Sequence, residues 1–445
     1  MSKHLAPAAF GLALVAAACA SSATVEVEAD SYVMPVYEEL GPIEIDRVTT
    51  AVPWPRGVRF IDGQLYALAR GVHRSAGGPQ EHIEDHAGSI FVIDPGVGED
   101  ALADAPVGAG VRTNGQIIAA PEEQPFRLWN RQMPATLDIY TDRPYCMLVW
   151  DEPSQNFFVC GYSGIDIPEQ PLFRKNATDS VHRYDLRNGL RSVVEAHDPD
   201  VVPAEELAVD VDSRYYPHHD PATNAAPHGL VNGPCGAVVA GDYLYVGGKD
   251  NTALAQYDLH EIRENPDAPA PDARYVFEGS QGYVMVDTVH HGQMQVNGTA
   301  AMTVHEGYLY VAFRTTSQII RFPLEENGDL VRPLKAEYIA QFARYDTGRP
   351  GRSANIYDMA FDSEGRLYVS PGYDGAVYRF WPDPERVYDT LNVDYEPYID
   401  LEPLVGAKKS GNICFDNQDN LYICSGQQVL DDSEIRGVIY KVAKR

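Results

Sequence analysis

One stretch of the sequence occurs twice and constrains the fold more than any other feature. Residues 231–246 read VNGPCGAVVAGDYLYV and residues 296–311 read VNGTAAMTVHEGYLYV, so the copies align without a gap at an offset of 65 residues. Each copy is a short apolar run, a tight polar turn, and an aromatic and β-branched run. This pattern is typical of an antiparallel hairpin.

The same hairpin pattern returns four more times. The further copies begin at Gly57, Cys146, Asp358 and Asn412. Six diverged copies of one β unit indicate a radial or stacked repeat. They also place most of the 445 residues in one domain, although the length alone would suggest two or three.

The strands that follow each hairpin predict four-stranded blades. Two further strands are expected after each of the first five hairpins, but the last hairpin is followed by only one, GVIYKVAKR. The missing strand is available in residues 43–52, which we expect to pair with residues 436–442. The fold predicted for residues 43–445 is therefore an all-β, six-bladed β-propeller whose last blade is closed by an N-terminal strand.

The hairpin unit, written G-I-A-V-D-x-x-G-x-L-Y-V, resembles the six-bladed propellers of the NHL-repeat and gluconolactonase-like (SMP-30) families over residues 43–445. The resemblance to gluconolactonase-like enzymes implies a catalytic divalent ion, held by an acidic residue and asparagines at the start of the first strands. The matching positions here are Arg56, Tyr145, Cys235, Ala300, Tyr357 and Gly411, which include no carboxylate and no amide. The ligands of that family therefore do not carry over, although Asp358 and Asn412, one position further on, would suit a shifted ion.

The N-terminal residues predict export. Residues 1–18 have a cationic start, an apolar run and small residues before Cys19, which is the pattern of a signal peptide. The stretch VAAAC resembles a bacterial lipobox, so lipidation of Cys19 and simple cleavage both stay open. Residues 19–42 are expected to form an acidic tether, and no later stretch is apolar enough to cross a membrane. The predicted location is periplasmic or extracellular.

The strongly negative net charge limits which molecules this protein can bind. The 64 acidic and 35 basic side chains give a net charge of −29, which repels phosphate backbones and argues against nucleic-acid binding. We expect a monomer with a small-molecule or carbohydrate ligand. In an oxidising compartment, cysteines that bracket a hairpin suit disulfides, so the pairs Cys146–Cys160 and Cys414–Cys424 are predicted, with Cys235 unpaired.

Long insertions are expected on one side of the propeller. Loops between blades, and loops between the second and third strands of a blade, share a face, which we call the elaborated face. Its predicted insertions are residues 71–87, 122–144, 161–179, 199–234, 280–299 and 343–355. Long loops on a rigid scaffold commonly carry function.

Histidines gather in the loops of the elaborated face. The sequence has 13 histidines, and the densest group is His218, His219, His228, His290 and His291. Converging imidazoles suit Zn²⁺, Fe²⁺ or Mn²⁺, and oxygen ligands suit Ca²⁺. The alternative is that these histidines are solvated or bond to loop carbonyls, because no tight ligand spacing is present.

Polar residues at the predicted channel mouth favour an anionic ligand. Arg56 and Tyr145 put cationic and phenolic groups there, in a strongly acidic protein. Asn232 and Asn297 are candidate ligand-binding residues, although each precedes glycine and Asn-Gly is a preferred turn pair. We assign candidate catalytic roles to Arg56, Tyr145, Asp358 and Asn412.

The sequence leaves three functions open. The first is an exported enzyme, a metal-assisted lyase or hydrolase acting on a small or carbohydrate anion. The second is a non-catalytic propeller, tethered at the cell envelope, that binds a glycan or a protein. The third, a quinone-dependent sugar dehydrogenase, has only the propeller class in its favour.

Overall fold

The computed structural model describes a defined part of the chain. The described residues are 43–49, 52, 55–69, 90–96, 116–119, 145–161, 180–185, 190–196, 231, 233–249, 252–265, 272–277, 283–342, 356–372, 375–389, 397–407, 409–431 and 434–444. They belong to one compact unit, Pro42–Arg445. The other unit, Met1–Gly41, lies outside the described residues, as do the predicted signal peptide and the whole predicted tether.

Three sheets in the first part of the unit follow one plan, in which strands that are consecutive in sequence pair side by side. Their strands, in order, are β2 (Pro55–Ile61), β3 (Gln64–Ala69), β4 (Ile90–Ile93) and β5 (Gln116–Ala119); β6 (Tyr145–Asp151), β7 (Asn156–Gly161), β8 (Ser180–Asp185) and β9 (Leu190–Ala196); and β10 (Pro234–Ala240), β11 (Tyr243–Gly248), β12 (Leu254–Asp258) and β13 (Ala273–Phe277).

Two further sheets repeat the plan with small departures. They consist of β16 (Thr299–His305), β17 (Tyr308–Phe313), β18 (Gln318–Pro323) and β19 (Glu337–Gln341), and of β20 (Asp358–Phe361), β21 (Leu367–Ser370), β22 (Ala376–Phe380) and β24 (Ile399–Asp400). A short strand, β23 (Tyr388–Asp389), adds to β19 in parallel. The fourth strand of the second sheet is only two residues long.

The last sheet joins the two ends of the unit. It contains β25 (Ile413–Phe415), β26 (Leu421–Asp431) and β27 (Glu434–Val442), and its fourth strand is β1 (Ile45–Thr49). β1 lies antiparallel to β27, with Ile45 opposite Val442 and Thr49 opposite Ile439. The predicted pairing of the N-terminal strand is therefore present, and it covers the edge that β27 would otherwise expose.

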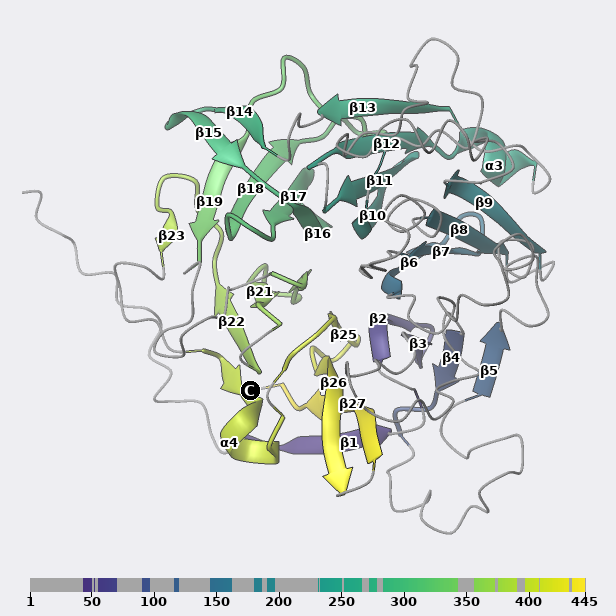
Figure 1. The fold of residues 1–445 in the computed structure, drawn as a ribbon. Coiled ribbons are helices and arrows are strands. Elements are labelled where there is room, and N and C mark those ends of the chain that lie inside the picture. Colours follow the sequence, from purple (N-terminus) through teal and green to yellow (C-terminus); the bar gives the residue numbers. More distant parts are fainter. Residues whose placement is uncertain are drawn as a thin grey trace, which may run out of the picture. The chain divides into compact units, whose positions relative to one another are not determined.

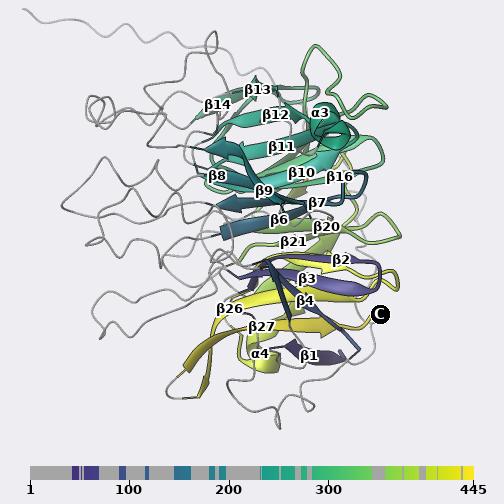
Figure 2. The ribbon, with the colours of Figure 1, turned by 90° about the vertical axis from the view of Figure 1, so that its right-hand side faces the viewer.

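The first strands of the sheets contact one another in chain order: β2 contacts β6, then β6 contacts β10, and the series runs through β16, β20 and β25 back to β2. Figure 1 shows the sheets following one another in this order within the unit, and Figure 2 shows them stacked edge-on. The predicted all-β propeller arrangement is therefore confirmed. Five blades are recognised among these sheets, against the six that the sequence predicts, so the number six stays a prediction.

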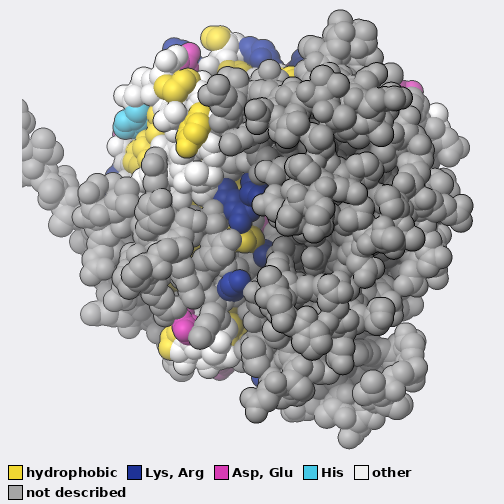
Figure 3. Space-filling model, viewed as in Figure 1, with side chains coloured by type: hydrophobic (Ala, Val, Ile, Leu, Met, Phe, Trp, Pro, Cys, Tyr) yellow, Lys and Arg dark blue, Asp and Glu magenta, His cyan; other side chains and the backbone are white. Residues whose placement is uncertain are grey.

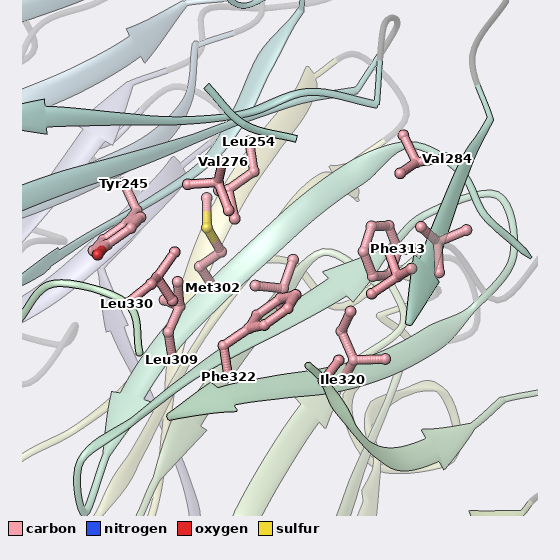
Figure 4. Packing of buried hydrophobic residues seen from close by; sticks show 14 of the residues in the cluster. Tyr245, Leu254, Val276, Val284, Met302, Leu309, Phe313, Ile320, Phe322 and Leu330 are labelled. Carbon is pink, nitrogen blue, oxygen red and sulfur yellow. The ribbon is translucent and has the colours of Figure 1, made fainter. Parts of the chain in front are cut away.

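Apolar side chains fill the space between neighbouring sheets. The aromatic residues of the second strands, such as Tyr245, Tyr310 and Tyr422, are fully buried, as expected for core packing. Between the sheets of β10 and β16, Phe313 and Phe322 pack with Met302 and other apolar residues (Figure 4). Burying one such side chain contributes roughly 1.5–3 kcal/mol, so the sheet-to-sheet contacts hold the ring together.

The loop predicted over residues 280–299 contains structure of its own. β14 (Val284–Thr288) and β15 (Gly292–Val296) form a separate hairpin. Its β14 end is tied to the segment before β19, because Val289 donates its backbone N–H to the carbonyl of Ala336. Two short helices, α3 (His260–Glu264) and α4 (Leu401–Val405), lie in other connections. Among the described residues, no helix is long and apolar enough to cross a bilayer.

Candidate functional site

A β-bulge at the start of β2 sets the position of the first candidate residue, Arg56. The register passes from Arg56, opposite Leu68, to Val58, opposite Ala67, so Gly57 is an extra residue. Gly57 has φ +55°, and a Cβ there would lie 2.3 Å from the backbone nitrogen of Leu148. Glycine is therefore required for the close approach of β2 to β6. On a regular strand, Arg56 and Arg59 would face opposite sides of the sheet, because they are three positions apart. The extra residue shifts the alternation by one, so the two side chains can face the same side.

Arg56 meets two residues from other sheets at the elaborated face. Its guanidinium carbon lies 4.4 Å from the ring centroid of Tyr357, which immediately precedes β20. The guanidinium of Arg314, in the turn after β17, lies 5.4 Å from the same centroid. We call Arg56, Arg314 and Tyr357 the mouth group. Two cations at one phenol ring are attracted to its π face, and together they form a positive surface.

Glycine holds the ring of the mouth group in place. Gly372 has φ +81°, and a Cβ there would lie 1.8 Å from Cδ2 of Tyr357, so the ring packs directly on the glycine backbone. The Tyr357 backbone N–H also donates to the carbonyl oxygen of Ser370 at 2.7 Å. The Ser410 hydroxyl bridges this region, since it accepts from Gly372 and donates to the carbonyl of Ala376. The Tyr357 ring is thus a fixed surface against which Arg56 rests.

The charge of Arg56 is buried without a counter-ion among the described residues. Its exposed fraction is 8%, and its guanidinium packs on the ring of Tyr357. No hydrogen bond or ion pair of its side chain occurs within the described part of the chain. A buried charge is costly unless an opposite charge or hydrogen bonds compensate it. A buried guanidinium with no counter-ion among the described residues is therefore the strongest indication of a ligand site.

A second polar cluster lies next along the same strands. Asp358 is fully buried and accepts backbone hydrogen bonds from Met359 at 2.9 Å and Ile413 at 3.0 Å. Arg59 lies 3.8 Å from its Oδ2. The side chains of Arg59 and Asn412 both reach the thioether sulfur of Met147, at 3.3 and 3.6 Å. We call Arg59, Met147, Asp358 and Asn412 the central group.

The central group links neighbouring sheets through hydrogen bonds to the Asp358 carboxylate. Burial raises the pKa of Asp358, and the Arg59 charge and the donors from Ile413, Met359 and Asn412 lower it less. The carboxylate joins β20 to β25 through the Ile413 N–H, and the Asn412 amide donates to it as well. The donors around Asp358 therefore come from the protein itself.

The structure contains neither of the predicted disulfides in its described part. Cys160, Cys235, Cys414 and Cys424 are all buried, and none of them is joined in a disulfide. The reason is register: Cys414 faces Tyr422, and the backbone N–H of Cys424 bonds to the carbonyl of Asn412, so the two thiols are offset along the hairpin.

The other predicted disulfide fails for a similar reason. Cys160 lies opposite Met147 because the register of β6 skips position 146, whose side chain is outside the described residues. Burial raises the pKa of Cys414 and Cys424 well above the usual range of a thiol, so neither is a thiolate near neutral pH.

Of the candidate residues Asn232, Asn297 and Tyr145, the structure describes the side chain of Asn297 alone. Asn297 is half-buried, and its backbone groups form a turn, with its N–H bonded to the Thr316 hydroxyl and its carbonyl to the N–H of Thr315. Gly298 follows with φ +74°, as a tight turn requires. Asn232 and the side chain of Tyr145 lie outside the described residues.

The predicted histidine ligands are separated from the mouth group where the structure describes them. His290 and His291 are exposed at the turn of the β14–β15 hairpin. The ring of His291 contacts Tyr338 of the outer strand β19, with centroids 5.5 Å apart. His218, His219 and His228 lie outside the described residues. Within the described part, no three His, Cys, Asp or Glu side chains are arranged to hold a metal ion.

Arg59, Met147, Arg314 and Tyr357 were not among the predicted site residues. Tyr357 was recognisable as a residue that precedes a first strand, and Arg314 as a turn residue on the elaborated face. Nothing in the sequence indicated Arg59 or Met147, because their meeting depends on the bulges of β2 and β6. Figure 3 shows Lys and Arg side chains gathered near the middle of the face that Figure 1 presents.

Comparisons with known proteins find similarity of structure alone. No known family model and no curated protein matches the chain. A luciferin-regenerating enzyme is 8% identical with a TM-score of 0.43, and the match covers 91% of this chain and 96% of that enzyme. Regucalcin from Agrobacterium tumefaciens, a calcium-binding protein, is 12% identical, with a TM-score of 0.44 and the same coverage. An inactive variant of virginiamycin B lyase from Staphylococcus aureus is 10% identical, with a TM-score of 0.40, and the match covers 91% of this chain and 99% of the lyase. Similarity at this level does not assign a function.

Proposed function

We propose that this protein is an exported, six-bladed propeller, closed by its N-terminal strand and related to the NHL-repeat and gluconolactonase-like type, that binds a small organic anion at the mouth group. The observation that carries the proposal is the buried guanidinium of Arg56, which has no counter-ion among the described residues. An anion placed on it recovers the cost of burying the charge, through charge-assisted hydrogen bonds. Arg314, at the same ring, adds a second cation to the site.

We further propose that the bound anion is a substrate for a lyase or hydrolase. In this reaction a divalent ion would polarise a carboxylate or carbonyl, and a histidine or tyrosine would move the proton. His218, His219 and His228 are the candidate ligands for Zn²⁺, Fe²⁺ or Mn²⁺, and oxygen donors of the same face are candidates for Ca²⁺. Metal analysis of the purified protein, with and without substitution of His228 by Ala, tests this part of the proposal.

One observation favours the second candidate, a non-catalytic binding propeller for a glycan or a protein at the cell envelope. The buried carboxylate of Asp358 accepts hydrogen bonds from Met359, Ile413 and Asn412. A carboxylate held by three internal donors is a weak candidate for a general base. Turnover assays on carboxylates that bind separate the candidates, since a binding protein returns the ligand unchanged.

The anion proposal is tested by titration calorimetry with acetate, succinate, galacturonate and sulfate. At least one of these anions is expected to bind, and substitution of Arg56 by Gln is expected to weaken it by roughly 10- to 100-fold, the value of a charged hydrogen bond. Arg332→Gln is the matched control, because Arg332 is exposed in the connection between β18 and β19. Equal affinities for the wild type and Arg56→Gln would refute the proposal.

A further inference from the structure

Two complementary polar groups are buried near the mouth; the first has no counter-ion among the described residues, and the second has no hydrogen-bond partner. One is the Arg56 guanidinium, which is a cationic donor. The other is the Oδ1 atom of Asn412, an acceptor in a residue with an exposed fraction of 1%. Buried acceptors are nearly always hydrogen-bonded in folded proteins, so an exception beside a candidate site points to a ligand.

The orientation of the Asn412 amide is fixed from its nitrogen end. Its Nδ2 group donates to the Asp358 carboxylate and lies 3.6 Å from the sulfur of Met147. Rotating the amide by half a turn would point its oxygen at the carboxylate, which is unfavourable because both are acceptors. The unpaired oxygen is therefore a stable feature of the site.

The Arg56 guanidinium and the Asn412 oxygen lie beside the same backbone segment. A Cβ added to Gly411 would lie 3.6 Å from Nη1 of Arg56, so the guanidinium rests next to the residue that precedes Asn412. Arg59 is also close, since it shares the sulfur of Met147 with the Asn412 amide. A thioether is a weak acceptor, so the Arg59 side chain is held only weakly by Met147. A ligand can therefore displace Arg59 more easily than the other neighbours and reach Oδ1 of Asn412.

We propose that the anion bound at the mouth group is a hydroxycarboxylate, whose carboxylate pairs with Arg56 and whose hydroxyl donates to Oδ1 of Asn412. This inference rests on the proposed anion-binding function and narrows its ligand class. A hydroxyl fits better than an ammonium group, because the Arg59 cation already stands 3.8 Å from Oδ2 of Asp358 in the same cluster. A second cation there would be repelled.

The test compares carboxylates that differ by one hydroxyl group: lactate against propionate, and malate against succinate. The wild type is expected to bind the hydroxylated member of at least one pair about tenfold more tightly, which corresponds to one net hydrogen bond of about 1.4 kcal/mol. Asn412→Leu is expected to bring this ratio close to one while carboxylate binding remains. Arg332→Gln, the exposed control of the anion test, should preserve the ratio.

The two proposals fail in different ways. If carboxylates bind through Arg56 but the wild-type ratio is near one for both pairs, the hydroxycarboxylate inference is overturned and the anion site stands. If neither member of either pair binds, both are overturned. The wild-type ratio decides the inference even where Asn412→Leu does not fold. A ratio that persists in a folded Asn412→Leu protein excludes Oδ1 as the acceptor.

Discussion

Two buried aspartates, each with an arginine beside it, are held in different ways. Asp151 ends β6 at the face opposite the mouth group, and Arg263 of α3 grips both of its oxygens, with Nη2–Oδ1 at 2.7 Å and Nε–Oδ2 at 3.1 Å. The Ser154 hydroxyl also donates to this carboxylate. Asp358, at the start of β20, has Arg59 only at 3.8 Å and depends on backbone donors.

We call the Asp151–Arg263 pair the closed clamp and the Asp358–Arg59 pair the open clamp. Arg263 also donates to Asp242 and to the carbonyl of Gly241, so it makes four hydrogen bonds within the protein. Arg59 contacts the weak thioether acceptor of Met147 and the neighbouring carbonyl of Val58. Arg263 is therefore held by two carboxylates at the face opposite the mouth group, whereas Arg59, nearer the mouth group, has weaker partners.

The largest expected effect is on the closed clamp. Arg263→Met should lower the free energy of unfolding by about 3–5 kcal/mol, because it leaves the Asp151 carboxylate buried without its partner. Asp242→Asn is the matched control; it removes the exposed partner of the same arginine and should cost less than about 1 kcal/mol. Denaturant unfolding followed by tryptophan fluorescence measures both, and equal losses would erase the distinction between the two clamps.

Removing the carboxylate of the open clamp should have the next largest effect. Asp358→Ala orphans the buried N–H groups of Met359 and Ile413, so a loss of about 2–3 kcal/mol is expected, at the level of leaving buried donors unsatisfied. Asp287→Ala, on the exposed side of β14, is the control and should stay within about 0.5 kcal/mol of the wild type. A loss at Asp358 as small as that of the control would show that this residue does not join the sheets.

A smaller loss is expected for the arginine of the open clamp. Arg59→Met should cost about 1 kcal/mol, since Asp358 keeps its backbone donors and the long ion pair is a weak one. This change is the direct counterpart of Arg263→Met. If the two substitutions were equally destabilising in the same unfolding assay, Arg59 would be held as firmly as Arg263 and could not yield to a ligand.

The smallest expected effect is the pH dependence of stability, which should differ in sign between the carboxyl groups of Asp358 and Asp419. Burial raises the pKa of Asp358 above its ordinary value of 3.8, so the folded state binds this proton more tightly than the unfolded state does. The stabilisation is complete below 3.8 and is lost as the pH rises through the folded-state pKa. The stability difference between wild type and Asp358→Asn should therefore fall with rising pH.

Asp419 should behave in the opposite way. Burial alone would raise its pKa, but the hydrogen bonds from Lys444 and Ser363 outweigh this and lower it to about 2. Its stabilisation is present above the unfolded value of 3.8 and is lost as the pH falls towards 2. Unfolding midpoints of wild type, Asp358→Asn and Asp419→Asn between about pH 2 and 6 measure both slopes, and slopes of the same sign would contradict the assignments.

Much of the architecture followed from the sequence because it is written in local, repeated patterns. The two aligned copies at residues 231–246 and 296–311 became β10–β11 and β16–β17, and the missing strand of the last sheet was found in β1. Apolar periodicity and turn residues fix such hairpins within a few residues of chain. The hairpin β14–β15 was missed because exposed apolar residues, Tyr283 just before it and Met285 within it, obscure the alternation in a segment that has no counterpart in the repeat.

The sequence by itself determined the class of fold and the position of Arg56 at the start of a first strand. Only the tertiary structure decided that Arg56 meets Tyr357 and Arg314, that Cys414 and Cys424 are out of register for a disulfide, and that His291 contacts an outer strand instead of the mouth group. Hairpins are set by neighbours in sequence, whereas these contacts depend on bulges, register and the closing of the ring, which bring residues far apart in the chain within a few ångströms.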